Sequence, residues 1–215
     1  MLAKERMSHP VITVYPDLPI QKALKLMREE HVRRFPVVDK RGRLVGIISE
    51  RDLLHAAPSG AISLSVWELN YLLSQITVEE VMTREVITIS EDTPLEEAAR
   101  IMADKKIGGL PVVRKGEVVG IITETDLFKV FLEMMGGRVP GVRISVLVRN
   151  MPGELTKLTQ AIFEGGGKIV ALGTFLGESS ENQEVTIKVE GVDSKSLVPI
   201  IKPLVERMID IRESR

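Results

Sequence analysis

"GIISERDLL" at residues 46–54 returns as "GIITETDLF" at residues 120–128, seventy-four positions later. Both copies keep a glycine, a hydroxyl and a carboxylate at the same spacing. The matching residues are Gly46, Ser49 and Asp52 in the first copy and Gly120, Thr123 and Asp126 in the second. Because recurrence at a fixed period indicates duplicated structural units, we expect the flanking sequence to repeat as well.

The similarity extends upstream of both copies. Residues 11–38, VITVYPDLPIQKALKLMREEHVRRFPVV, align without a gap with residues 86–113, VITISEDTPLEEAARIMADKKIGGLPVV. Each copy reads as an extended segment, an amphipathic helix, a strand, a glycine turn, a second strand and a short helix. The sequence therefore predicts two β-α-β-β-α units, over residues 1–57 and 81–137.

Between the units, residues 58–80 carry apolar side chains at helical spacing. Trp67, Leu69, Leu72 and Leu73 form this pattern. We expect a helical connector that packs on the pair of units rather than a flexible linker.

The pattern changes after Gly136 and Gly137. Residues 138–215 read as strand, helix, two strands, helix and a last strand, with Asp193 placed to cap the second helix. This order, β-α-β-β-α-β, is the ferredoxin-like arrangement. The chain is therefore expected to be a mixed α/β (α+β) protein with two repeated units and a third domain over residues 138–215.

Composition excludes several classes of function. The 29 Lys and Arg nearly balance the 30 Asp and Glu, and only 4% of residues are aromatic. Such a chain has neither the charge that binds nucleic acid or an anionic membrane nor the aromatic platforms that stack bases. The absence of cysteine excludes disulfides and thiolate chemistry. With no signal-peptide pattern at the start and no apolar run long enough to span a bilayer, we expect a cytoplasmic protein.

The repeated SERD and TETD segments allow two interpretations. Ser or Thr followed three residues later by an acid is a capping box, which starts a helix. A strand that ends at such a helix also presents free backbone N–H groups to a phosphate, and the acid can accept hydrogen bonds from a ribose diol. The two interpretations are compatible, and the second describes a nucleotide site.

The landmarks VITV, PVVD and GIISERD, repeated as VITI, PVVR and GIITETD, resemble two CBS domains in tandem, a Bateman module, over about residues 1–135. The resemblance implies a pseudo-two-fold pair that binds AMP, ADP or ATP, or in some members S-adenosylmethionine, in clefts between the units. It implies that Asp52 and Asp126 hold ribose hydroxyls and that Ser49 and Thr123 meet phosphate. It also implies that Thr13 and Thr88 line the clefts, with the backbone around Pro36 and Pro111 near their base.

The two copies differ in the basic residues before their PVV strands. The first has His31, Arg33 and Arg34, whereas the second has Lys105 and Lys106 followed by two glycines. Arg34 and Lys106 are candidate phosphate contacts, the alternative being solvated surface charge. The two clefts therefore need not be equivalent.

The C-terminal part resembles an ACT domain over about residues 141–215, on the segment RNMPGELTKL. The resemblance implies formation of a homodimer or higher oligomer and an amino-acid site at Asn150, Gly153 and Leu155. Asn150 stands where most members have Asp, and the segment also suits a simple helix start. The order CBS, CBS, ACT is most similar to the acetoin utilization proteins of the AcuB family.

No catalytic constellation is evident, so we expect a regulatory protein and not an enzyme. The segment EGGGKI lacks the first glycine and the Ser or Thr of a phosphate-binding loop. The leading hypothesis is a sensor of adenine nucleotide that needs no cofactor or metal and signals to an unidentified partner protein. The alternatives are an oligomeric adaptor without ligand, a sensor of S-adenosylmethionine and, last, a small enzyme that uses its acidic clusters.

Overall fold

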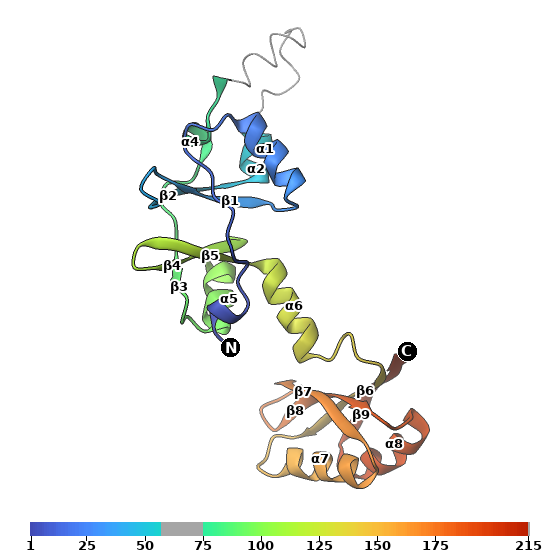
Figure 1. Ribbon diagram of the computed structural model, residues 1–215. Helices are drawn as coiled ribbons and strands as arrows, with labels where there is room; N and C mark the ends of the chain where they lie inside the picture. The colour runs from blue at the N-terminus through green and yellow to red at the C-terminus, as the bar shows by residue number, and fades with distance from the viewer. Residues whose placement is uncertain (57–74, 215) are drawn as a thin grey trace. The chain divides into compact units, whose positions relative to one another are not determined.

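The structure, a computed structural model, describes residues 1–56 and 75–214 (Figure 1). The chain divides into two compact units, Met1–Leu127 and Phe128–Arg215. The connector expected over residues 58–80 lies, as far as residue 74, outside the described residues. In the described ranges no helix is both long and apolar enough to cross a membrane.

The first repeat is built on a hairpin between two helices. Its elements are α1 (Ile20–Glu29), β1 (Arg34–Val38), β2 (Leu44–Ser49) and α2 (Glu50–Ala56). α1 starts after Pro19 and buries Ile20, Ala23 and Met27, which lie one helical turn apart. They join a core that also contains Phe35. Burial of a large side chain in such a core contributes about 1.5–3 kcal/mol.

The second repeat has the same elements with one strand more. They are β3 (Ile89–Ser90), α5 (Leu95–Lys105), β4 (Gly109–Arg114), β5 (Glu117–Thr123) and α6 (Glu124–Met134). β3 pairs parallel with β4, and β4 pairs antiparallel with β5. In the first repeat the corresponding extended segment is joined to β1 by an isolated parallel bridge between Val14 and Val37. A bridge between Arg43 and Glu117 joins the two hairpins.

Each repeat is completed by a segment from elsewhere in the chain. The short helix η1 (Ala3–Glu5) and the residues after it pack on the second repeat, where the N–H of Ser8 donates to Ile121 O at 2.8 Å. The short helix α4 (Val78–Val81) and the residues after it pack on the first repeat, where the N–H of Thr83 donates to Ile47 O at 2.9 Å.

The two completing segments repeat each other. Met7 lies against Gly120 and Met82 lies against Gly46, and a side chain on either glycine would collide with the methionine thioether. The duplication therefore reaches back to residues 2–8 and 77–83, about ten residues before the VITV and VITI segments. Each repeat is closed by the segment that precedes the other one in the sequence.

The second unit contains one antiparallel sheet and two helices. Its elements are β6 (Gly141–Arg149), α7 (Glu154–Glu164), β7 (Lys168–Leu176), β8 (Asn182–Glu190), α8 (Ser194–Ile201), the short helix η2 (Lys202–Leu204) and β9 (Arg207–Ser214). The strand order is β7-β8-β6-β9, with all three pairs antiparallel. The expected β-α-β-β-α-β order is confirmed.

The helices cover one face of this sheet, and alternate residues of the central strands form the core beneath them. Ile144 and Val146 of β6, Ile187 of β8 and Leu158 of α7 are all fully buried. Asp193 caps α8, accepting a hydrogen bond from the N–H of Ser196 at 2.8 Å, as the sequence predicts.

Candidate functional site

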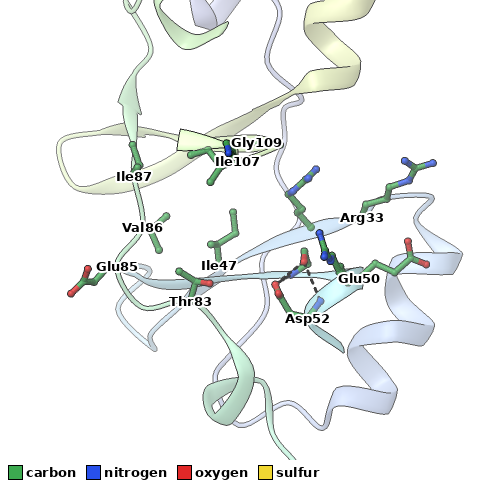
Figure 2. A pocket seen from close by; sticks show the side chains of 15 residues that line it. Arg33, Ile47, Glu50, Asp52, Thr83, Glu85, Val86, Ile87, Ile107 and Gly109 are labelled. Atoms are coloured by element: carbon green, nitrogen blue, oxygen red, sulfur yellow. Dashed lines mark hydrogen bonds between the residues drawn. The ribbon is translucent and has the colours of Figure 1, made fainter. Parts of the chain in front are cut away.

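A cavity of about 400 Å³ lies in the first unit, between the two repeats (Figure 2). Its volume is in the range that small-molecule sites occupy. The end of β2, the start of α2, the segment after α4 and the residues before β4 form its walls. The lining residues are Arg33, Arg34, Ile47, Ser49, Glu50, Arg51, Asp52, Thr83, Glu85, Val86, Ile87, Lys106, Ile107, Gly108 and Gly109.

Asp52 stands on one wall of the cavity, fixed by the residue that starts its helix. Its Oδ2 accepts from Ser49 Oγ at 2.6 Å and from the Ser49 N–H at 2.9 Å. The Asp52 N–H donates in return to Ser49 Oγ at 3.2 Å. This is a reciprocal capping box, so the capping interpretation of SERD holds. The other carboxylate oxygen, Oδ1, has no hydrogen bond within the described residues.

The capping box also engages the hydroxyl hydrogen of Ser49. A serine hydroxyl has one hydrogen to donate, and here Asp52 receives it. Ser49 therefore orients Asp52 in this structure. The phosphate contact expected of Ser49 stays a prediction, and it requires this hydrogen bond to break.

The second repeat builds the same pair. Asp126 Oδ2 accepts from Thr123 Oγ1 at 2.7 Å and from the Thr123 N–H at 3.0 Å. Asp126 is more enclosed than its counterpart, with 7% of its surface exposed, whereas Asp52 is half-buried. Thr123 and Asp126 are not part of the lining of the cavity described above.

Basic and acidic side chains share the cavity. Arg33, Arg34 and Lys106 contribute positive charge and have no ion pair in the part of the chain that the structure describes. Glu50 adds negative charge near Asp52, and Glu85 adds negative charge on the opposite side of the cavity. The walls between these groups are apolar, from Ile47, Val86, Ile87 and Ile107 (Figure 2). Apolar walls with a few polar groups are typical of small-molecule sites.

The sequence-predicted site residues fall into two groups. Ser49, Asp52, Arg34 and Lys106 meet in the cavity, although Lys106 lies seventy-two positions after Arg34. The other group lies outside the lining, and its members are Thr13, Thr88, Pro36, Pro111, Thr123 and Asp126. The roles of this second group stay predictions.

Several lining residues escaped the sequence interpretation. Thr83, Glu85 and Val86 belong to the segment that crosses from the second repeat to close the first. The sequence contains a signal for this segment, because Met82 and Thr83 repeat Met7 and Ser8 at the same offset as the VITV and VITI segments. Gly108 and Gly109 also line the cavity, and only tertiary structure shows why they are glycines.

The loop between β6 and α7 contains the residues expected to hold an amino acid. Asn150 is exposed, and its Nδ2 donates to Ser180 O at 3.1 Å. Gly153 starts α7 with a φ of +94°, and Leu155 packs against the core of the second unit. Asn150 and Gly153 therefore shape a loop and a helix start here.

A smaller cavity of about 360 Å³ lies beside this loop. Arg149, Glu154 and Lys157 line it, together with residues 203–206. Glu154 is only 6% exposed and accepts from Lys157 Nζ at 2.6 Å. This hydrogen bond holds the pKa of Glu154 below its ordinary value of 4.5, with Arg149 adding to the effect. Across residues 1–56 and 75–214, no three His, Asp or Glu side chains cluster as metal ligands would.

Comparison with known proteins identifies the first unit. The family model for the CBS domain matches residues 3–59 and 78–133. A CBS domain-containing protein of Dictyostelium discoideum is 33% identical over 136 residues, which cover 63% of this chain and 94% of that protein. The L-aspartate semialdehyde sulfurtransferase of Methanocaldococcus jannaschii is 35% identical over 131 residues. The match covers 60% of this chain but only 23% of the sulfurtransferase.

Many solved structures are similar to this chain. The CBS domain pair of protein MJ0100, in complex with 5′-methylthioadenosine and S-adenosyl-L-methionine, has 34% identity and a TM-score of 0.52, covering 64% of this chain and 98% of that one. CBSX2 in complex with AMP has 29% identity and a TM-score of 0.52, covering 62% and 97%. An acetoin utilization protein (AcuB) from Vibrio cholerae has 30% identity and a TM-score of 0.54, covering 64% and 95%.

Proposed function

The chain belongs to the CBS-domain family, and from that premise we propose that it is a regulatory protein whose paired repeats bind an adenine nucleotide in the cavity beside Asp52. Ligand binding stabilises one conformation of the protein, and a partner protein recognises that conformation. A ligand at a hundredfold its dissociation constant adds about 2.7 kcal/mol to the state that it prefers.

The observation that carries this proposal is the unused oxygen of Asp52. Ser49 holds Oδ2, so the carboxylate is fixed in direction while Oδ1 is available. A fixed carboxylate accepts well from the two hydroxyls of a ribose, and each such charge-assisted bond contributes about 1.5–3 kcal/mol. The apolar side chains of Ile47, Val86 and Ile107 offer the surface that an adenine ring needs.

The basic side chains of the cavity favour a ligand that carries a phosphate. Arg33 and Lys106 carry charges that no described acid neutralises, and both line the same cavity as Asp52. A phosphate provides the missing partner for these cations. Arg34 lines the same cavity.

The competing ligand is S-adenosylmethionine, which is bound by a similar CBS pair. Its sulfonium would meet Glu50 or Glu85 in this cavity. Four basic residues stand against three acidic ones in the lining, which favours an anionic tail over a cationic one. AMP, the ligand of another similar CBS structure, satisfies the same walls and the same cations.

We assign the third domain, residues 138–215, to assembly, as an ACT-like domain that forms a homodimer. Its sheet ends in two edge strands, β7 and β9, and Leu176 on β7 is 97% exposed. Unpaired edges of this kind favour pairing with a second copy. Amino-acid binding near Asn150 and Gly153 would take place at such an interface. The divisions 1–57, 58–80 and 81–137 are proposed for the remainder of the chain.

Thermal unfolding with added ligand tests the proposal. AMP, ADP and ATP should raise the melting temperature of the full chain, and Asp52→Ala should remove that rise. A larger rise with S-adenosylmethionine than with any nucleotide would select that ligand instead. No shift with any adenine compound would identify an adaptor without ligand, and turnover of a nucleotide that Asp52→Ala abolishes would identify an enzyme.

A further inference from the structure

Arg34 reaches from the first repeat to the second, where Gly108 makes room for it. A Cβ atom placed on Gly108 would lie only 2.8 Å from Cζ of Arg34, so the two atoms would clash. The aliphatic part of the side chain is also confined, because its Cδ lies 3.3 Å from the Cβ position of Gly109. The guanidinium therefore fills the space that a side chain on Gly108 would need, in the cavity beside Asp52.

The hairpin of the first repeat fixes the backbone of Arg34 relative to Asp52. Arg34 begins β1 and is the register partner of Ser49, the last residue of β2. Ser49 in turn holds the carboxylate of Asp52 through two hydrogen bonds. The guanidinium and the carboxylate proposed to hold ribose are thus both positioned by one pair of strands, which places side chains more accurately than a loop does.

Arg34 is the least exposed of the four basic residues that line the cavity. Arg33, Arg51 and Lys106 are exposed, whereas Arg34 is half-buried. No acid forms an ion pair with Arg34 in the part of the chain that the structure describes. A guanidinium has five N–H donors, and its planar fork matches the oxygens of a phosphate. Because packing already restricts this side chain, it loses less conformational entropy when it binds a ligand.

Glu124 places a negative charge beside the same guanidinium. Its Oε2 lies 2.7 Å from the Cβ position of Gly108, the point that Arg34 also approaches. The backbone supports this placement, because the Glu124 N–H donates to Gly108 O at 3.3 Å. The Glu124 side chain is exposed, begins α6 and is not part of the lining of the cavity. A phosphate bound to Arg34 therefore meets the charge of Glu124 at close range.

We propose that Arg34 makes the cavity select phosphate-bearing adenine compounds over phosphate-free ones, and that Gly108 and Glu124 set the strength of this selection. Gly108 admits the guanidinium, and Glu124 weakens phosphate binding because it partly neutralises the guanidinium. This inference rests on the proposed function and goes beyond it, since it names the group of the ligand that is selected and a residue that limits its affinity.

Calorimetric titration of the full chain with AMP and with adenosine tests the role of Arg34. The unmodified chain should bind AMP at least about tenfold more tightly than adenosine, the contribution of one charge-assisted bond. Arg34→Ala should remove most of that difference by weakening AMP, while the affinity for adenosine stays within about twofold. Equal affinities of the unmodified chain for both compounds, or equal losses of both in Arg34→Ala, would overturn the inference.

Gly108→Ala tests whether the glycine acts through Arg34. The three atoms nearest to the new methyl belong to the ends of the Arg34 and Glu124 side chains, which can move, so the variant should fold, and its melting temperature checks this. It should weaken AMP binding by about tenfold and spare adenosine. The double variant Gly108→Ala/Arg34→Ala should bind AMP no more weakly than Arg34→Ala alone, because the methyl then displaces no guanidinium. Additive losses would exclude this role of Gly108.

Glu124→Gln should change affinity in the opposite direction, which a merely structural role would not do. Removal of the negative charge should raise the affinity for AMP by about threefold, and by more at low salt, without changing that for adenosine. Glu96→Gln is the matched control, because this glutamate is exposed on α5 and lies outside the lining. An unchanged or lowered affinity for AMP in Glu124→Gln would exclude the role given to Glu124.

Failure of the inference can be told apart from failure of the proposed function. AMP binding that Asp52→Ala weakens and Arg34→Ala leaves unchanged would overturn the inference while the proposed function stands. Absence of binding heat and of any melting shift with AMP, ATP, adenosine and S-adenosylmethionine would overturn both.

Discussion

The thioether of Met82 occupies the place where a side chain on Gly46 would lie, although the two residues are thirty-six positions apart. Gly46 sits in the middle of β2, and Met82 belongs to the segment that closes the first repeat after α4. The same contact recurs between Met7 and Gly120. These glycines are therefore packing positions, where the backbone of one segment must approach the strand of another.

Gly46→Ala should destabilise the first unit. The new methyl would meet the Met82 side chain and would stand 3.1 Å from the carbonyl oxygen of Thr83, which the backbone bond to Ile47 fixes in place. We expect a loss of about 1–3 kcal/mol, typical of an overpacked core. The midpoint of urea unfolding measures it. The double variant Gly46→Ala/Met82→Ala should recover part of the loss, and strict additivity would contradict the contact.

Ser49→Ala and Thr123→Ala should separate capping from binding. Each removes one hydroxyl from equivalent capping boxes, so each should cost about 1 kcal/mol of stability. Only Ser49→Ala should also weaken nucleotide binding, because it frees the carboxylate of Asp52 from its fixed direction. Equal effects of the two variants on affinity, measured by titration calorimetry, would show that binding does not depend on the cavity beside Asp52 alone.

Lys106→Gln should weaken ATP binding by about tenfold, or about 1.4 kcal/mol, through the loss of one cation from the cavity. Lys105→Gln is the matched control, because the neighbouring lysine is exposed and lies outside the lining. The effect on AMP should be smaller than that on ATP, since AMP carries fewer phosphates. Equal losses in the two lysine variants would reduce the role of Lys106 to general surface charge.

Glu154 should give the second unit an acid-sensitive component of stability. Its folded pKa lies below the ordinary value of 4.5, chiefly because Lys157 donates a hydrogen bond to it. The stabilisation is complete above the unfolded pKa and is lost as the pH falls from about 4.5 through the lower folded pKa. The melting temperature should therefore fall less on acidification in Glu154→Gln than in the unmodified chain.

Lys157→Gln provides the second arm of this test. It removes the chief cause of the lowered pKa while Glu154 remains, so it should also reduce the fall in melting temperature on acidification. If the melting temperature of both variants falls on acidification as much as that of the unmodified chain, the acid sensitivity belongs to other carboxylates.

Much of the fold could be predicted from local pattern. The helices α1 and α5 follow from apolar side chains one turn apart after Pro19 and Pro94, and the capping boxes at Ser49 and Thr123 follow from three-residue spacings. These signals are local because a helix start or an amphipathic face is encoded by residues only a few positions apart in the sequence. The β-α-β-β-α-β order of the second unit was accessible for the same reason.

The sequence by itself determined that the chain contains one unit written twice, and that Ser49 and Asp52 must act together. Tertiary structure decided which residues from the two copies meet. Thr83 lines the cavity because its segment crosses to the hairpin of the first repeat, and Arg34 leaves its own repeat to lie against Gly108. Contacts of this kind depend on how whole elements pack, so the two copies of a duplicated sequence contribute different side chains to the cavity beside Asp52.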